Sequence, residues 1–422
     1  MLNVYRVRLY PNKTACQAIN SNIGCCRWVY NEALKYCQDI YEQNQRADKD
    51  HQQKRPSGYD LCHRLVKIKN EFPWLADADS QALKFACLNV DQAYKNFFRR
   101  VRQGVNPGFP RFKSRYRGSQ SYTATAGASI HINFVTPSVK IPKIGWIRCR
   151  GLRWFEGKIQ RATIRRMPTG KYYCSILTKN DLPEPVAVPV KRSDQLTAID
   201  LGIRYMVVVE SGTKNKTIEH PHFMERMHKK LAREQKKLAR KKNNWKRGQP
   251  VSSNYKKQQT RVARIYEKIT DARRNYAHHV SRDLVTMNDA LVLEDIDIKG
   301  IMQKLAPVHD ENGNYLPNGR KLQKKWNRFI ADASWYSLSQ MIQYKAARDS
   351  KPVILIDPVV GPNKICSACG FYHDAVTLEN IRWTCPECNR DHDRNKNCLK
   401  NLKSLAFSVG TAEQVVKPEN NQ

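Results

Sequence analysis

The chain has 422 residues, and its 74 Lys and Arg against 38 Asp and Glu give a formal net charge of +36. With 41% hydrophobic and 9% aromatic residues it can bury substantial cores, which excludes general disorder, and its length predicts roughly two to four folded units. A mean hydropathy of −0.68 and the lack of an apolar run near the ~18 residues that cross a bilayer exclude a membrane-spanning protein. The amino terminus has no apolar segment of the signal-peptide kind, so we expect the protein to stay in a reducing cytosol.

The basic excess predicts a polyanionic partner, because a chain of this charge repels itself unless an anion offsets it. Nucleic acid is the polyanion that most often does so. A membrane surface is the second alternative, but cationic membrane binders concentrate their charge on one amphipathic helix or tail. Here Lys and Arg recur along most of the sequence. Nucleic acid is therefore the favoured partner.

The first part of the chain predicts a strand, a group of helices and then a sheet. Residues 3–10 alternate in strand fashion, and 16–45 repeat apolar residues at helical spacing. Further helices are expected between 61 and 104, and they end before Pro107 because proline cannot continue a helix. From 121 to 178, short alternating runs separated by turn residues predict a small antiparallel sheet or barrel.

A proline-rich segment, 181–194, is the best candidate for a linker. After it, residues 196–212 read as two strands in a hairpin, with Gly202 at or near the turn. The segment 225–274 contains 18 Lys and Arg but four acids, and its apolar residues predict two amphipathic helices joined around 247–254. Charge runs are usually solvated helix faces, but this imbalance would destabilise a helix unless anions neutralise it.

The rest of the chain alternates strands with helices, which predicts an α/β core with a mixed or parallel sheet. An apolar strand lies within 289–300 and another within 351–358, and a helix is expected over 331–348. The insertion that contains 310–320 reads as irregular, and 398–407 reads as a short helix before a polar tail.

Four of the 13 cysteines form one motif, Cys366-x2-Cys369 and Cys385-x2-Cys388, separated by 15 residues. This spacing predicts two knuckles that bind one Zn²⁺ tetrahedrally. Two disulfides or four free thiols fit a cytosolic chain badly. Four thiolates leave no open coordination position, so the zinc is expected to be structural. The nine scattered cysteines read as small buried residues or free thiols.

Carboxylates end two of the predicted strands. Asp200 closes TAID and Glu294 closes LVLE, while Asp391, Asp393 and Asn395 stand at the expected start of a helix. Acids brought from separate strands to one edge of a sheet suit two-metal phosphodiester hydrolysis, because two Mg²⁺ ions need hard oxygen ligands. A lone strand-terminal acid is more often a cap or an ion-pair partner.

The order of these motifs resembles the TnpB proteins of bacterial insertion sequences, relatives of the compact type V CRISPR effectors. The resemblance covers nearly the whole chain and rests on VYRVRLYPN, AYKNFFRRV, GFPRFKSR, AIDLGI, LVLEDI, DASWYSLSQMIQYKA, the four cysteines and HDRNKN. It implies a multidomain α+β protein: a small β-barrel with an inserted helical lobe, a RuvC-like α/β domain of RNase H fold with a helical hairpin, and an inserted zinc ribbon.

The resemblance also implies domain boundaries. The oligonucleotide-binding-like barrel would take 1–11 and 119–187, the helical recognition lobe 12–118, the RuvC-like domain 188–362 and 389–407, the zinc ribbon 363–388, and a polar tail 408–422. An RNA-guided DNA endonuclease is the implied function. Its implied partners are a transposon-derived guide RNA and double-stranded DNA with a short flanking motif, and its implied location is the bacterial cytoplasm, at the nucleoid.

Carried over residue by residue, Asp200 and Glu294 match the first two catalytic acids and Mg²⁺ ligands of the family. The third position holds Asn395 where the family usually has Asp. Loss of this charge should weaken Mg²⁺ binding and lower the rate on the order of 10³-fold. On a helix Asp393 points away from Asn395, which disfavours it as a replacement, although Asp393 and Asp391 stay the first alternatives for the third ligand.

The sequence therefore favours a weakened or inactive nuclease, and two other classes stand beside it. One is a natural nuclease-deficient RNA-guided DNA binder that represses transcription. The other is a DNA-strand transposase, which is disfavoured because no tyrosine or DDE arrangement exists apart from the RuvC-like set.

Several basic residues are candidates for nucleic-acid contact. Lys95 and Arg99 lie on a predicted helix that also carries aromatic residues, and Arg111 and Lys113 follow it, a mixture that suits phosphate contact with stacking. The resemblance implies that Gln81 and Lys84, just upstream, read the flanking DNA motif. Guide–target pairing would supply the remaining sequence choice.

Overall fold

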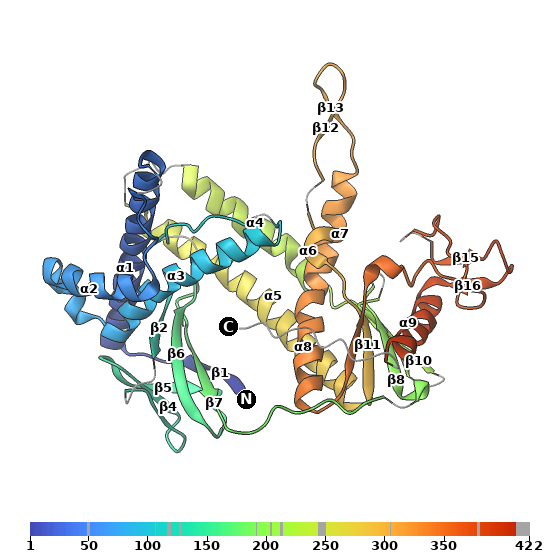
Figure 1. Ribbon diagram of the computed structural model, residues 1–422, viewed down its shortest axis with the longest axis horizontal. Coiled ribbons are helices and arrows are strands. Elements are labelled where there is room, and N and C mark those ends of the chain that lie inside the picture. The colour runs from blue at the N-terminus through green and yellow to red at the C-terminus, as the bar shows by residue number, and fades with distance from the viewer. Residues whose placement is uncertain are drawn as a thin grey trace. The chain divides into compact units, whose positions relative to one another are not determined.

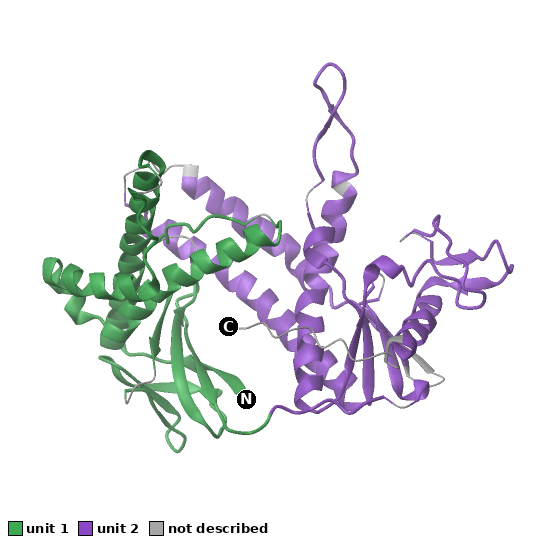
Figure 2. Cartoon of the chain, viewed as in Figure 1, with its two compact units in different colours: residues 1–183 green, residues 184–422 purple. Residues whose placement is uncertain are grey.

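The computed structural model describes residues 1–48, 51–105, 107–115, 120–125, 129–190, 192–202, 205–211, 214–243, 250–303, 305–377 and 380–410. It divides into two compact units, Met1–Pro183 and Glu184–Gln422 (Figure 2). The division falls inside the proline-rich segment 181–194 that the sequence suggests as a linker. No helix within the described ranges combines the length and the apolar character that crossing a membrane requires.

The helices of unit 1 follow its first strand. They are α1 (Lys13–Arg46), α2 (Gly58–Glu71), the 3-10 helix η2 (Pro73–Asp77) and α3 (Ser80–Arg102). Side chains cap their starts: Asn12 accepts from Ala15 N at 2.8 Å, and Ser57 and Asp60 form a capping box. Scattered cysteines such as Cys37 lie in the shared core, as the sequence predicts.

Seven strands form one antiparallel sheet in unit 1. They are β1 (Leu2–Leu9), β2 (Gln120–Thr125), β3 (His131–Asn133), β4 (Ser138–Ile141), β5 (Gly145–Arg150), β6 (Lys158–Arg166) and β7 (Tyr172–Lys179). Their order is β2-β6-β7-β1-β5-β4-β3, with β1 joining the two hairpin sets. No pairing links the edge strands β2 and β3 within the described residues, so the sheet is curled and open.

The sheet of unit 2 has the order β10-β9-β8-β11-β14. Its strands are β8 (Leu196–Asp200), which the short 3-10 helix η3 (Ser193–Gln195) precedes, β9 (Val207–Ser211), β10 (Lys214–Ile218), β11 (Ala290–Glu294) and β14 (Val353–Ile356). The first three are antiparallel, which confirms the predicted hairpin, and β8, β11 and β14 are parallel. The carboxyl ends of these three strands therefore lie at one edge of the sheet.

Helices cover both faces of this sheet (Figure 1). Helices α5 (Ser253–Thr286) and α8 (Trp335–Arg348) pack on one face, and α9 (Arg394–Gly410) packs on the other. Helix α4 (Phe223–Asn243) pairs with α5, as the basic segment predicts, although part of their connection, 244–249, lies outside the described residues.

Two predicted segments differ from the structure. The helix expected over 331–348 is broken at Ser334, whose φ of 54° is left-handed, so α7 (Arg320–Ala333) and α8 are separate helices. The insertion after α6 (Ile298–Ile301) contains a two-stranded ladder, β12 (Val308–His309) and β13 (Tyr315–Leu316), where the sequence suggests irregular chain. Asp310 closes its turn by accepting from Asn314 N at 2.7 Å.

The cysteine segment follows β14 and the 3-10 helix η4 (Pro358–Val360). It contains the antiparallel pair β15 (Arg382–Thr384) and β16 (Asp391–Asp393), and β16 runs directly into α9. Gly370, after the first cysteine pair, has a φ of 79°, a left-handed conformation that glycine adopts readily in a tight turn. Trp383 is 8% exposed and packs on His392, with ring centroids 4.7 Å apart.

Candidate functional site

Strand alternation decides where the acids of β8 and β11 point, because successive side chains face opposite sides of a sheet. Ala198 and Val292 pack with α9, in a cluster separate from the one beneath α5 and α8. Asp200 and Glu294 lie two residues further along their strands and so face α9 as well. Both acids therefore stand on the α9 side of the sheet, at its carboxyl edge.

The register brings these two acids next to each other. Ile199 pairs with Leu293 in the parallel ladder, so Asp200 and Glu294 occupy the next equivalent positions on strands about 4.8 Å apart. Asp200 is 6% exposed, and its Oδ2 atom is buried with no hydrogen-bond partner among the described residues.

Burial and proximity make this pair electrostatically unfavourable when ionised. Desolvation raises the pKa of Asp200 to about 6, and the Arg394 guanidinium opposes this rise. Desolvation, followed by the neighbouring Asp200 charge, raises the pKa of Glu294 to about 7, again opposed by Arg394. An orphaned carboxylate oxygen and two raised carboxyl pKa values are what a bound divalent cation would relieve, so these residues fit a metal site.

The first turn of α9 lies against the same edge. Burial, then Asp200 and Glu294, raise the pKa of the Cys398 thiol, which places Cys398 beside both acids. Asn395 lies three residues earlier, on the same face of the helix. Its Oδ1 atom accepts from Arg394 Nη2 at 3.3 Å. The structure thus brings Asp200, Glu294 and the Asn395 turn together, with Arg394 among them.

The other acids of this segment have different tasks. Asp393 ends β16 and directly precedes α9, at the helix start that the sequence predicts. Its Oδ1 accepts from Lys396 N at 3.1 Å and caps the start of α9. Asp391 is exposed on β16 and accepts from Thr384 Oγ1. Neither acid therefore takes the place of a third carboxylate beside Asp200.

The four predicted zinc ligands, Cys366, Cys369, Cys385 and Cys388, converge, and all four sulfur atoms lie within 4.8 Å of one another. Cys366 Sγ is 3.7 Å from Cys388 Sγ, and Cys369 Sγ is 3.6 Å from Cys385 Sγ. A Zn–S bond of about 2.3 Å in a tetrahedron requires sulfur separations of about 3.8 Å. These distances exceed a disulfide bond and match tetrahedral metal coordination.

The predicted DNA-reading residues Gln81 and Lys84 are both exposed in the first turns of α3. Two further lysines join them, which sequence reasoning missed because they come from distant segments. Desolvation, then the charges of Lys143 and Lys84, lower the pKa of Lys69. Lys69 also donates to Ser80 Oγ at 2.9 Å. The three lysines form a cationic cluster beside Gln81 that an anion would stabilise.

The other predicted contact residues divide into two kinds. Lys95 Nζ lies 3.0 Å from Asp91 Oδ2, and Lys113 Nζ lies 3.9 Å from the centre of the Tyr30 ring. Both ammonium groups therefore have partners within the protein. Arg99 and Arg111 are exposed, which leaves them the better placed of the four for phosphate contact.

The curled sheet of unit 1 adds a basic surface that the sequence analysis did not single out. None of its seven strands contains Asp or Glu. Arg6, Arg148 and Arg150 are exposed on it, and Arg8 pairs directly with Arg150 across β1 and β5. Like charges directly opposite each other are destabilising, so this face also favours an anionic partner.

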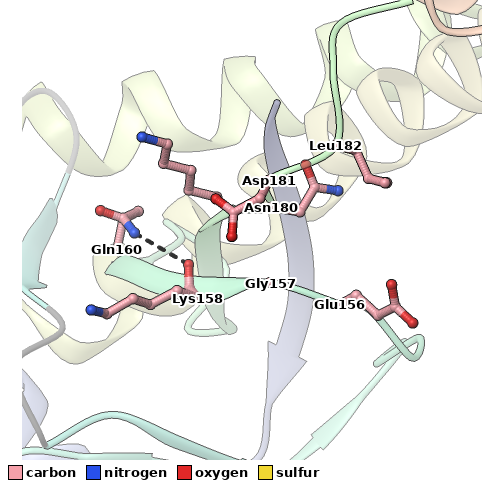
Figure 3. Close-up of a pocket in the computed structure, with 8 residues that line it drawn as sticks. Glu156, Gly157, Lys158, Gln160, Asn180, Asp181 and Leu182 are labelled. Carbon is pink, nitrogen blue, oxygen red and sulfur yellow. Dashed lines mark hydrogen bonds between the residues drawn. The ribbon is translucent and has the colours of Figure 1, made fainter.

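A pocket in unit 1 lies where β6 and β7 meet at Gly157 (Figure 3). Its charged lining residues are Glu156, Lys158, Lys179 and Asp181. Gln160 Nε2 donates to Lys158 O at 3.4 Å within it. Two acids and two lysines thus balance each other in charge here, and the pocket shares no element with the edge that holds Asp200 and Glu294.

Three family descriptions match different parts of the chain. "Probable transposase" of the OrfB type from IS605 matches residues 176–305, a "Helix-turn-helix domain" of the same family matches 1–46, and the "Cas12f1-like, TNB domain" matches 335–402. The InsQ protein of Escherichia coli (strain K12), named as a candidate RNA-guided DNA endonuclease, is 26% identical over 420 residues, 99% of this chain and 95% of that protein. These matches support the resemblance of the chain to the TnpB family.

Other similar proteins also match over most of the chain. A protein of Streptomyces pristinaespiralis, also named as a candidate RNA-guided DNA endonuclease, is 27% identical over 424 residues, which are 98% of this chain and 92% of that protein. Among solved structures, the Cas12f1–sgRNA–target DNA complex matches with a TM-score of 0.51 at 11% identity, over 91% of this chain and 81% of that one. This likeness supports the multidomain α+β fold. In this chain the helix-turn-helix match covers strand β1 and the long helix α1.

Proposed function

We propose that the protein is an RNA-guided DNA-binding effector of the TnpB type, with a metal-dependent DNA endonuclease site that Asn395 weakens. The observation that carries this proposal is the pair Asp200 and Glu294 on adjacent parallel strands, both facing the helix turn that holds Asn395. Relatives that span nearly the whole chain carry the endonuclease name, which supports the same reading.

In this proposal Asp200 and Glu294 hold Mg²⁺ through their carboxylates, and the metal supplies water activation and stabilisation of the charge that develops on the cleaved phosphate. Asn395 can offer only a neutral amide oxygen, and that oxygen already accepts from Arg394. The site therefore offers two carboxylate ligands, one neutral amide oxygen and the cationic Arg394 to an entering metal. Such a site binds two divalent cations less tightly than one with three carboxylates.

The remaining parts take supporting roles. The cysteine cluster holds a structural Zn²⁺, and the curled sheet with the helices of unit 1 binds guide RNA and the DNA next to the target. The α4–α5 hairpin, with its exposed lysines, contacts nucleic-acid backbone. We assign the RuvC-like RNase H fold to the five-stranded sheet and its helices, and the oligonucleotide-binding-like barrel to the curled sheet, at the boundaries given above. The protein then acts in the bacterial cytoplasm, at the nucleoid.

A second candidate is an RNA-guided DNA binder without cleavage, acting as a transcriptional repressor. Asn395 favours this function, because Asn in place of Asp removes one negative charge from the metal ligands and leaves the cationic Arg394 beside the two acids. The basic surfaces serve this function equally well, since holding guide and target needs phosphate contacts and no metal chemistry.

The first test is purification from the host at moderate salt, followed by sequencing of the bound RNA. We expect RNA to accompany the protein and to direct it to matched double-stranded DNA in a gel-shift assay. Protein that is free of RNA at low salt, or that binds matched and unmatched DNA equally, would contradict both candidates.

The comparison of the native chain with N395D separates the two candidates. N395D restores a third carboxylate and should raise Mg²⁺-dependent cleavage of matched DNA on the order of 10³-fold, while DNA affinity stays unchanged. D200A in the N395D chain should abolish cleavage again. Equal cleavage by the native and N395D chains would mean that the third ligand comes from elsewhere, whereas no cleavage before the substitution favours the repressor.

A further inference from the structure

The first cysteine knuckle and helix α9 form one hydrogen-bonded body. Asn397 is 2% exposed, and its Oδ1 accepts from Ser367 N at 2.8 Å while its Nδ2 donates to Ile365 O at 2.6 Å. These two partners flank Cys366 in the chain. A single buried amide on α9 therefore hydrogen-bonds the backbone on both sides of a predicted zinc-ligand cysteine.

A second amide, one helical turn later, makes similar hydrogen bonds to the same backbone segment. Asn401 is 6% exposed, and its Nδ2 donates to Ile365 O at 2.6 Å and to Pro362 O at 2.8 Å. Positions 397 and 401 lie on the same face of α9, next to the face whose Cys398 and Leu402 pack on the sheet. The helix is thus held between the sheet and the knuckle.

The start of α9 is tied to the same segment. Arg394 N donates to Ile381 O at 2.9 Å, and His392, just before the helix, places Nε2 3.0 Å from Cys366 Sγ. The first turn of a helix has little hydrogen bonding of its own and depends on such external partners. Residue 395 lies in this turn, so its position depends on the geometry of the cysteine knuckle.

We propose that Asn397 and Asn401 are positioning residues through which the metal-bound cysteine cluster fixes the first turn of α9, and with it residue 395. Without the metal the four cysteines take up protons and are no longer held at fixed separations, so the backbone at 365–367 relaxes and both amides lose their partners. The proposal rests on the proposed function only for the role of residue 395, since the coupling itself is a property of the chain.

Hydrogen exchange of the full, zinc-loaded chain without nucleic acid or Mg²⁺ tests the coupling. N397S and N401S should speed exchange at 394–401 by about tenfold or more, because a buried polar group without its partner destabilises the local fold. Zinc content should stay unchanged. The matched control is N22S, because Asn22 is also buried and also joins a backbone N–H to a backbone carbonyl, but in unit 1.

Chelation of zinc supplies the decisive comparison. In the native chain, chelation should speed exchange at 394–401 as much as N397S does, and chelation of N397S should add little further. Independent, additive effects would overturn the proposal, as would an N397S chain whose 394–401 exchange equals the native rate. If N397S does not fold, N397D keeps the acceptor for Ser367 N and loses only the donor to Ile365 O, and it should show the same non-additivity.

These measurements need no cleavage and no guide RNA. Failure of the coupling therefore leaves the proposed function in place, and failure of guided DNA binding leaves the coupling in place.

Discussion

Replacement of Glu294 by Gln should stabilise the metal-free protein, and more so as the pH rises. Glu294 has its pKa raised from 4.5 to about 7, first by desolvation and then by the charge of Asp200. A carboxyl group whose pKa is higher in the folded than in the unfolded chain favours folding only while it is protonated. Its contribution is complete below about pH 4.5 and is lost as the pH rises through 7.

The magnitude follows from that rise, since one pH unit corresponds to about 1.4 kcal/mol. Ionisation of Glu294 lowers the free energy of unfolding by about 3 kcal/mol above pH 8 and by about 1.4 kcal/mol at pH 5.5. E294Q keeps the shape of the side chain and removes the charge. It should therefore gain about 2 kcal/mol more stability at pH 8.5 than at pH 5.5.

Urea unfolding of the zinc-loaded, RNA-free chain at both pH values measures this difference, without chelator and without Mg²⁺. Comparison of mutant and native chains at the same pH cancels the titration of other groups. The control is E311Q, because Glu311 is exposed in the β12–β13 turn and its replacement should change stability little at either pH. An E294Q effect of equal size at both pH values, or a loss of stability at pH 8.5, would refute the account of the buried acid pair.

Two further predictions concern the metal and the basic surfaces. The purified protein should contain about one zinc per chain, and C385S should lose it, as elemental analysis and thiol titration can show; zinc retained by C385S would place the ligands elsewhere. K69Q and K143Q should each weaken binding of a short DNA duplex and lessen the slope of log affinity against log salt by about 1. An unchanged slope in both variants would show that the cluster of Lys69, Lys84 and Lys143 does not contact DNA phosphates.

Much of unit 2 could be predicted because its strands are apolar runs with acids at their ends. The positions of Asp200 and Glu294 follow from one rule, that the carboxyl ends of parallel strands meet at one edge. The hairpin after β8 and the amphipathic pair α4 and α5 follow from local periodicity in the same way. A pattern within one continuous stretch of sequence predicts each of these features.

The features that were missed depend on contacts between distant stretches. Nothing in the apolar spacing of 331–348 marks Ser334 as left-handed, since the pattern continues through it. The start of α9 is not such a feature, because the neighbouring Asp393 is a good capping residue and gives it a local signal. The cluster of Lys69, Lys84 and Lys143 has no local signal, because its members come from α2, α3 and the turn between β4 and β5.

Asn395 links the energetics of the fold to the chemistry of the site. Burial already raises both carboxyl pKa values in the metal-free chain, and repulsion by the Asp200 charge adds to the rise at Glu294. A third carboxylate at position 395 would add to this repulsion, and bound cations would have to offset it. With Asn at this position the apo fold carries less unfavourable charge and attracts divalent metal less strongly, so one substitution raises stability and lowers metal affinity for the same electrostatic reason. A protein that must occupy DNA without cutting it gains from both effects. A nuclease would gain stability but lose catalytic activity.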